Sequence, residues 1–507
     1  MNSTPGGAVV AASAPVPASV IDSGLRRMLL FGLLGFSAGL PFYMFSTVLA
    51  LRLQSHGVAL AIIGFFGWVQ LLPTVKFLWA PLLDRFDVPG FGRFWGKRRG
   101  WIMLAQLGIF TSMVAMALTS ADTSLAITAL FAVLLAFWTT TLEVAADAWR
   151  IELAPTPETQ GPLAAATLWG YRTAMVAAGS GALVVADLPG WGWTGAYLAI
   201  AAVAFLPFPI LATMRSETEN GGGRMVALVT GITASVALLL AAIAATAVAG
   251  WILLSAASRA GLDGTTNITY YVLGFAMAPF LIMAALLPKI VKAPRDAPIR
   301  TSTAIGPYVD FFWRYGFAAI VVMAFVAIYR MGDVLALQLS KPMIKELGYS
   351  LTEIGIADSY IALIASMVGV GLGGWMAARW PKARTLVIGA LFAALGNFAF
   401  VWLAHQPIGR LPLYLATAAD QFGNGMAGAI FVVYLSLLVN PRFAGAQYAF
   451  LSGWAFMLPR LIAGAGGQIV ERVGWDMFFL ASGAVSLAAI GFLPFIARTR
   501  ARPDDTP

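Results

Sequence analysis

The sequence contains no cysteine among its 507 residues, which excludes disulfides, thiolate metal sites and thiol nucleophiles. It has only two histidines, His56 and His405, and both fall at the edges of predicted loops. We therefore predict no enzyme activity, no metal site and no cofactor. Charged residues make up 11% of the chain, whereas a soluble domain carries about 25%. With hydrophobic residues at 60%, this scarcity of charge indicates a membrane protein.

Long apolar runs fill most of the chain, and a membrane-spanning helix needs about 20 apolar residues. On that criterion the sequence predicts fourteen helices, in two sets of six with a further pair between them. The first set covers 29–51, 59–83, 101–119, 124–149, 163–188 and 194–214. The inserted pair lies near 226–257 and 267–290. The last set covers 314–340, 353–377, 384–404, 411–438, 446–468 and 474–497.

These runs divide the chain into two six-helix halves, 25–215 and 314–497, around the inserted helices at 216–290 and a polar linker at 291–313. Residues 1–24 and 498–507 are predicted to be tails, the first of them disordered. The first tail is not expected to be a signal peptide, because the first apolar run is long enough to remain as a span.

The net charge of +9 is unevenly distributed along the chain. Most of the 32 Lys and Arg residues fall in connections on one side of the predicted membrane. Cytoplasmic loops carry such an excess, so we place the linker and both termini in the cytoplasm. The basic balance thus reflects orientation in a lipid bilayer and not binding of nucleic acid.

Two acids, Glu143 and Asp147, lie inside the fourth predicted helix, and their spacing of four places them on one face. A carboxylate at membrane depth costs roughly 2.5–3.5 kcal/mol, so this face should meet protein or a water-filled path. Two more acids fall within later spans, Asp333 and Asp420. Each acid is either a proton-coupling group or a structural partner of a cation; for the first two that partner would be Arg150 or Arg172.

Four cations lie within predicted spans: Lys76, Arg172, Arg330 and Arg460. They either neutralise the acids or bind carboxylates of a substrate, for which Arg offers a bidentate fork. The dipeptide Tyr-Arg occurs once in each half. Candidate substrate contacts accompanying the four cations are Tyr171, Tyr329, Trp149, Trp169 and Gln447. The two tryptophans are either interfacial anchors or platforms that stack on a sugar ring.

Several stretches together carry a family resemblance across residues 30–490. They are Gly35-Phe-Ser-Ala-Gly39-Leu-Pro41, Lys76-Phe-Leu-Trp-Ala-Pro81-Leu-Leu-Asp84-Arg85, Arg98-Arg99-Gly100-Trp101, Asp147-Ala-Trp149, Gly170-Tyr171-Arg172, Tyr329-Arg330-Met-Gly332-Asp333 and Ala446-Gln447-Tyr448-Ala449-Phe450-Leu451-Ser452. In these stretches the chain resembles the muropeptide permease (AmpG) family of the major facilitator superfamily. It departs from that family in having Leu142-Glu143 where Gln-Asp is expected, and Asp420-Gln421 where Glu-Asn is expected.

The resemblance implies an all-α integral membrane protein with the major facilitator fold, two six-helix halves plus two inserted helices. It implies a monomeric importer that carries anhydro-muropeptides from the periplasm across the bacterial inner membrane for cell-wall recycling, by proton symport. The alternatives are a related carrier of another anionic solute, of the acetyl-CoA type, and a membrane assembly factor built on the same fold. The short basic loops resemble the superfamily's signature loop, so a cytoplasmic gate is expected from Asp84, Arg85, Arg98, Arg99 and Arg379.

Two further expectations follow. Proton coupling is expected to run through Asp147, because an acid at mid-membrane with an arginine in reach can take up a proton during transport. The inserted helices are expected to be peripheral to transport, because residues 226–251 carry no charge, as in a lipid-facing span.

Overall fold

The computed structural model describes residues 24–58, 67–88, 95–119, 125–214, 282–283, 285–294, 297–464, 466–498 and 502. The predicted helix at 226–257, and most of that at 267–290, lie outside these ranges. Every regular element in the described part of the chain is helical. Nine of these helices are long and apolar enough to cross a membrane.

The N-terminal half follows the six predicted spans, several of which consist of consecutive shorter helices. Its elements are α1 (Gly24–Phe45), α2 (Thr47–Ser55), η2 (Gly67–Thr74), η3 (Lys76–Leu78), α4 (Ala80–Arg85), α6 (Lys97–Leu118), α7 (Leu125–Leu153), α8 (Pro157–Val176), η4 (Ala177–Gly181), α9 (Ala182–Asp187), α10 (Gly192–Ala204) and α11 (Pro207–Thr213).

The linker forms two short helices, and the C-terminal half again follows six predicted spans. These elements are α14 (Pro298–Thr301), α15 (Gly306–Tyr315), α16 (Ala318–Tyr329), α17 (Met331–Glu346), α18 (Leu351–Ile356), η5 (Ala357–Ile361), α19 (Ala362–Arg379), α20 (Lys382–Ala404), α21 (Arg410–Leu438), η6 (Pro441–Phe443), α22 (Ala444–Gly464), α23 (Gly466–Ala488), η7 (Ala489–Phe492) and α24 (Leu493–Arg498).

The predicted span at 314–340 is interrupted at a candidate site residue. Arg330, with φ −102° and ψ 0°, ends α16 and precedes α17. Irregular backbone at membrane depth is tolerated where protein surrounds it, and Arg330 is only 7% exposed. The interruption places Asp333 in the first turn of α17, where a negative charge interacts favourably with the helix dipole.

Glycines allow the closest helix contacts within each half. A Cβ at Gly170 of α8 would lie 1.9 Å from the Gly32 carbonyl oxygen of α1. In the other half, a Cβ at Gly425 of α21 would lie 2.4 Å from the Ser366 carbonyl oxygen of α19. Small residues let helices approach in lipid, where the hydrophobic effect does not drive helices together. The Gly-rich stretch around residues 423–428 thus serves helix packing.

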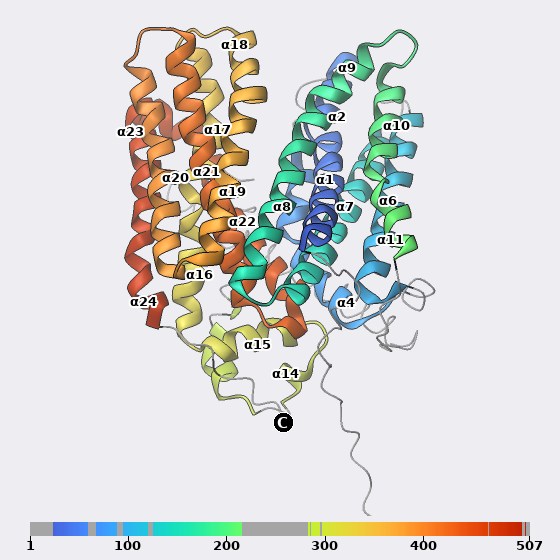
Figure 1. Ribbon diagram of the computed structural model, residues 1–507, viewed down its shortest axis with the longest axis vertical. Helices are drawn as coiled ribbons and strands as arrows, with labels where there is room; N and C mark the ends of the chain where they lie inside the picture. Colours follow the sequence, from blue (N-terminus) through green and yellow to red (C-terminus); the bar gives the residue numbers. More distant parts are fainter. Residues whose placement is uncertain are drawn as a thin grey trace, which may run out of the picture.

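The two halves stand side by side as separate bundles, coloured blue to green and yellow to red in Figure 1. Helices α14 and α15 lie across one end of the molecule, which we call the linker end; we call the opposite end, near α9 and α18, the far end. The ribbons of the two bundles diverge towards the far end. At the linker end, α4 and α7 of one half pack on α22 of the other, and α8 packs on α19.

Candidate functional site

A polar cluster lies between the halves, built around one buried ion pair. At the interruption between α16 and α17, Arg330 Nη1 lies 2.6 Å from Asp333 Oδ2. The same guanidinium donates to Asn424 of α21, through Nη1 to the backbone oxygen at 3.2 Å and through Nη2 to Oδ1 at 2.8 Å. All three residues are less than 10% exposed. Arg330 is therefore held by fixed partners within its own half.

Arg172 of α8 reaches this cluster from the opposite half. Its Nη2 donates to Asn424 Oδ1 at 3.4 Å, a long and weak hydrogen bond. The guanidinium is partly buried, and it makes no salt bridge with any residue in the described ranges. It lies close enough to Arg330 and Asp420 for their charges to interact. Arg172 is thus a partly buried cation between the halves whose hydrogen-bonding capacity is largely unused.

Asp420 is the acid of the cluster that lacks a cationic partner. Its Oδ2 accepts a hydrogen bond from Gln421 Nε2 at 2.8 Å, and its residue is 7% exposed. Among the residues that the structure describes, no Lys or Arg nitrogen lies within salt-bridge distance of it. Its charge interacts at longer range with Asp333, Arg172 and Arg330. Asp420 is therefore placed to gain or lose a proton without breaking an ion pair.

The acids of α7 are each paired. Glu143 Oε2 lies 3.2 Å from Lys76 Nζ, and Asp147 Oδ1 lies 3.0 Å from Arg150 Nη2. Of the two partners left open for Asp147, the structure selects Arg150 and not Arg172. The salt bridge of Glu143 is made with Lys76, which was not among its predicted partners, and a proton-coupling role for either acid stays a prediction.

Arg150 connects four helices near the linker end. Besides Asp147, its guanidinium donates to Gln160 Oε1 of α8 and, at 3.2 Å, to Ser436 Oγ of α21. It also lies over the Tyr448 ring of α22, with Cζ 5.6 Å from the ring centroid. Only 1% of Arg150 is exposed. The pair of Asp147 and Arg150 thus stabilises contact between the two halves.

The predicted gate residue Asp84 bridges the halves at the linker end. Its Oδ1 accepts from Arg98 Nη2 at 2.8 Å and from the Gly445 amide at 3.0 Å, and its Oδ2 accepts from the Ala446 amide at 2.7 Å. Those amides lie in the first turn of α22. The carboxylate therefore accepts hydrogen bonds from N–H groups that have no partner within the helix, and its charge is favourable beside the positive end of the helix dipole. Arg98 also binds Glu152 of α7, with Nε 3.0 Å from Oε1.

The other predicted gate residues do not join this bridge. Arg99 is fully buried and donates to the Met214 carbonyl oxygen at 3.2 Å. Arg85 and Arg379 are exposed, and Arg379 lies over the Trp375 ring at 5.3 Å. The bridge at the linker end therefore consists of Asp84, Arg98 and the start of α22, and a gating role for these residues stays a prediction.

Helix α15 closes the linker end by contacting both halves. The Tyr308 hydroxyl donates to the Phe77 carbonyl oxygen of η3. Asp310 Oδ2 accepts from Asn440 Nδ2 at 3.2 Å and from Gln447 Nε2 at 2.9 Å. Burial, and secondarily the charge of Asp84, raises the pKa of Tyr308 well above its usual range, so this hydroxyl remains a donor. Helix α15 thus joins the two halves at the linker end.

Several candidate substrate contacts lie in other environments. Gln447 has no exposure, and its amide binds Asp310, the Pro307 carbonyl oxygen and the Asn440 amide, so it fixes α15 instead of facing a substrate. Tyr329, 1% exposed, donates to the Leu386 carbonyl oxygen. Trp149, 2% exposed, packs on Phe31. These three occupy protein interior in this conformation.

Trp169 and Tyr171 of α8 are partly buried between these regions. Trp169 donates its indole N–H to the Met367 carbonyl oxygen of α19 at 2.8 Å, so it joins the two halves. A Cβ at Gly371 would lie 2.9 Å from its ring. Arg460 belongs to α22, but its side chain lies outside the described residues.

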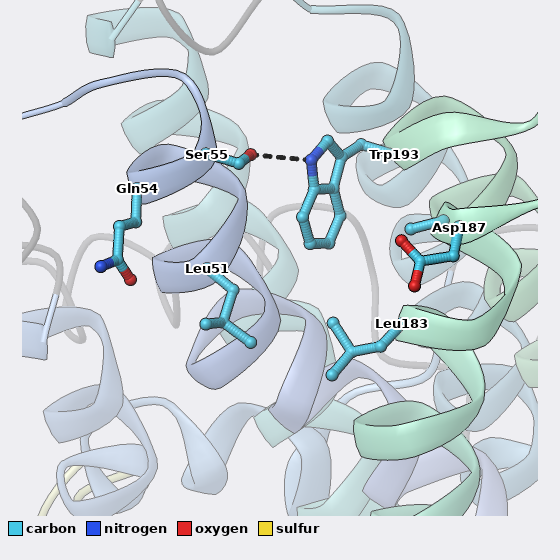
Figure 2. A pocket seen from close by; sticks show the side chains of 7 residues that line it. Leu51, Gln54, Ser55, Leu183, Asp187 and Trp193 are labelled. Carbon is cyan, nitrogen blue, oxygen red and sulfur yellow. Dashed lines mark hydrogen bonds between the residues drawn. The ribbon is translucent and has the colours of Figure 1, made fainter.

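A separate pocket of about 550 Å³ opens at the far end, wholly within the N-terminal half. Figure 2 shows the Trp193 indole there, donating to Ser55 Oγ at 2.8 Å, with Asp187 and Leu183 on the facing helix. None of the predicted site residues lines it. Over the described part of the chain, no three His, Asp or Glu side chains gather as a metal site would require.

Sequence reasoning missed the residues that connect the charged groups. Asn424 lies in the Gly-rich stretch of a predicted span. A polar amide among small residues there could have marked it as a candidate contact between helices. The contacts of Arg150 with Ser436 and Tyr448 depend on how the two halves meet, which the spacing of residues along the chain does not contain.

Comparison with known proteins gives the fold and the relatives. A model of the Major Facilitator Superfamily matches residues 325–507. The chain is 28% identical over 464 residues to a Rickettsia conorii protein named putative transporter AmpG 4, covering 92% of this chain and 95% of the relative. It is also 28% identical over 463 residues to the anhydromuropeptide permease of Escherichia coli K12, covering 90% of this chain and 77% of the permease.

Solved structures share the architecture at low sequence identity. The proton:xylose symporter XylE bound to 6-bromo-6-deoxy-D-glucose matches with a TM-score of 0.60 and 15% identity, over 94% of this chain and 96% of the symporter. A peptide transporter, POT, matches with a TM-score of 0.53 and 15% identity, over 94% and 93% of the two chains. At this identity the likeness concerns the fold alone, and it confirms the predicted major facilitator fold.

Proposed function

We propose that this protein imports anhydro-muropeptides by proton symport. It is a multi-pass membrane protein with the major facilitator fold, and it is related to the AmpG transporters over about nine-tenths of its length. The similarity to the anhydromuropeptide permease carries the substrate class. The inter-half cluster of Arg172, Arg330, Asp333, Asp420 and Asn424 supports it, because that cluster joins a poorly partnered cation to an unpaired acid.

The proposed direction is from the periplasm to the cytoplasm across the inner membrane. The Lys and Arg distribution assigns the linker end to the cytoplasm. The bridges made by Asp84, Arg150 and α15 join the halves at that end. These bridges support the proposal that this conformation faces outward, so that a substrate enters from the periplasm. The proposed transport cycle is alternating access by a monomer.

Arg172 is the proposed anchor for the substrate's carboxylate. The peptide stem of a muropeptide carries carboxylates, and a guanidinium binds a carboxylate through two parallel hydrogen bonds. Arg172 has donors to offer because its described bonding is limited to the long contact with Asn424. The exposed part of Arg172, with Tyr171 and Trp169 on the same helix, forms the N-terminal side of the proposed site.

Asp420 is the proposed principal proton acceptor among the candidates Asp147, Glu143, Asp333 and Asp420. The other three each lie within 3.2 Å of a cation, so protonating them breaks an ion pair. A carboxylate bound at Arg172 takes up the positive charge that otherwise attracts Asp420. Substrate binding and proton binding then favour each other, as symport requires.

Asp147 keeps a proposed role in the conformational step. It orients Arg150, which joins α7 to α21 and α22 of the other half. Loss of its charge would loosen the linker end, so the Asp147 and Arg150 pair, with Asp84 and Arg98, forms the proposed cytoplasmic gate.

Uptake by right-side-out membrane vesicles tests the function directly. Radiolabelled 1,6-anhydro-N-acetylmuramyl-tripeptide should enter vesicles that contain the protein faster than vesicles without it, and a protonophore should abolish accumulation. Acetyl-CoA should neither enter nor compete. Competition by acetyl-CoA with no uptake of the muropeptide would favour a carrier of another anionic solute, and uptake of neither would favour an assembly factor.

A further inference from the structure

One amide oxygen is shared by two guanidinium groups from opposite halves. Asn424 Oδ1 accepts from Arg330 Nη2 at 2.8 Å and from Arg172 Nη2 at 3.4 Å. Asn424 is 5% exposed, so this oxygen is shielded from bulk water. It accepts the hydrogen bond by which Arg172 of α8 meets α21.

The two hydrogen bonds differ in what surrounds them. Arg330 has two further bonds, to Asp333 at 2.6 Å and to the Asn424 backbone oxygen at 3.2 Å. Among the residues that the structure describes, the long contact with Asn424 is the only hydrogen bond of the Arg172 side chain. A neutral amide oxygen is also a weaker partner for a guanidinium than a carboxylate, whose charge-assisted bonds are about twice as strong. Arg172 therefore gains from exchanging this oxygen for a carboxylate, whereas Arg330 does not.

We infer that the side-chain oxygen of Asn424 occupies the position of a substrate carboxylate at Arg172 and is displaced when the substrate binds. Arg172 is then the anion-binding arginine, and Arg330 is a positioning residue that keeps Asn424 in place. This inference rests on the proposed transport of an anionic solute. It also gives a reason for an amide at residue 424: an aspartate there would satisfy both arginines permanently.

A purely structural bridge would behave in the opposite way. If Asn424 only joined the halves, Asn424→Asp would strengthen the bridge without hindering a substrate, and Asn424→Ala would weaken both the bridge and the site. As a stand-in for substrate, the aspartate competes with the incoming carboxylate, and the alanine leaves Arg172 free. The two variants thus separate the two roles by the sign of their effects.

Isothermal titration of the purified full-length chain with 1,6-anhydro-N-acetylmuramyl-tripeptide measures these effects. Asn424→Asp should weaken binding at least tenfold relative to wild type, and Asn424→Ala should tighten it severalfold. Unchanged or tighter binding by Asn424→Asp overturns the inference. If Asn424→Asp does not fold, Asn424→Ala decides alone, because weaker binding by that variant is the result a structural bridge predicts.

A second measurement needs no substrate and separates this inference from the proposed function. Phenylglyoxal modifies accessible arginines, and mass spectrometry of peptides locates the modified residue. Arg172 should react several times faster in wild type than in Asn424→Asp, while Arg330 reacts slowly in both. Equal rates at Arg172 overturn the inference. Absence of muropeptide binding by wild type, with the expected labelling, overturns the proposed substrate and leaves an anion site at Arg172.

Discussion

At the scale of single residues, Arg172 and Arg330 show how one residue type acquires two roles. Both follow a tyrosine inside an apolar run, and the sequence predicts equivalent functions for them. In the structure Arg330 has a carboxylate at 2.6 Å, whereas Arg172 has a shared amide oxygen at 3.4 Å. A buried ion pair is stable only when most of its hydrogen-bond donors and acceptors have partners, as those of Arg330 do. A residue that binds a substrate must instead keep donors available.

The matched substitutions Arg172→Lys and Arg330→Lys should therefore differ. Lysine keeps the charge and loses the planar fork. Arg172→Lys should fold normally and bind anhydro-muropeptide more weakly, by about 1.5–3 kcal/mol for a lost charge-assisted bond. Arg330→Lys should lower thermal stability, because Asp333, 3% exposed, loses part of its pairing. Isothermal titration and thermal unfolding in detergent measure the two effects. Wild-type affinity in Arg172→Lys would contradict its role as anchor.

At the scale of elements, closure of the linker end depends on how closely α8 and α19 approach. A Cβ at Gly161 of α8 would lie 2.4 Å from the Gly374 carbonyl oxygen of α19, a contact that backbone atoms cannot relieve by a change of rotamer. A Cβ at Gly181, in η4 directly after α8, would have no atom within 4 Å. These two glycines, in consecutive helical elements, offer a test and its control.

Gly161→Ala should shift the protein away from the conformation closed at the linker end. Alanine favours a helix more than glycine, so local helix stability does not account for such a shift. The chain has no cysteine, so two introduced cysteines can carry the only two spin labels. Glu158→Cys in the N-terminal half and Lys382→Cys in the C-terminal half suit this purpose, because both residues are exposed. Gly161→Ala should lengthen the distance between them and lower uptake severalfold, while Gly181→Ala should change neither. An unaltered distance in Gly161→Ala would mean that this contact does not limit closure.

The sequence predicted the elements well because membrane-spanning helices require long apolar runs, and each predicted span outside the inserted pair has helical counterparts in the structure. Contacts between elements were harder to predict. Gln447 belongs to the α15 contact and Trp149 to the interior of the N-terminal half, because a side chain's surroundings depend on helix rotation and on the partner half. Asn424 was missed since its importance arises only when α8 and α21 meet.

At the scale of the whole molecule, the proposed cycle couples the polar cluster to the linker end. Substrate and proton bind between the halves while Asp84, Arg150 and α15 keep the linker end closed. Opening towards the cytoplasm requires that these bridges break together. A carrier of this kind exchanges substrate without a proton gradient but accumulates substrate only when the proton site titrates.

The central claim is that proton coupling runs through the polar cluster that contains Asp420. It is tested most directly in proteoliposomes with an alkaline interior, by comparing wild type and Asp420→Asn for uptake of labelled 1,6-anhydro-N-acetylmuramyl-tripeptide. Wild type should accumulate the muropeptide above the external concentration and lose that accumulation with a protonophore. Asp420→Asn should still exchange labelled for unlabelled substrate across the membrane, yet fail to accumulate it. Accumulation by Asp420→Asn equal to that of wild type, or accumulation by wild type that survives the protonophore, would contradict proton coupling through this cluster.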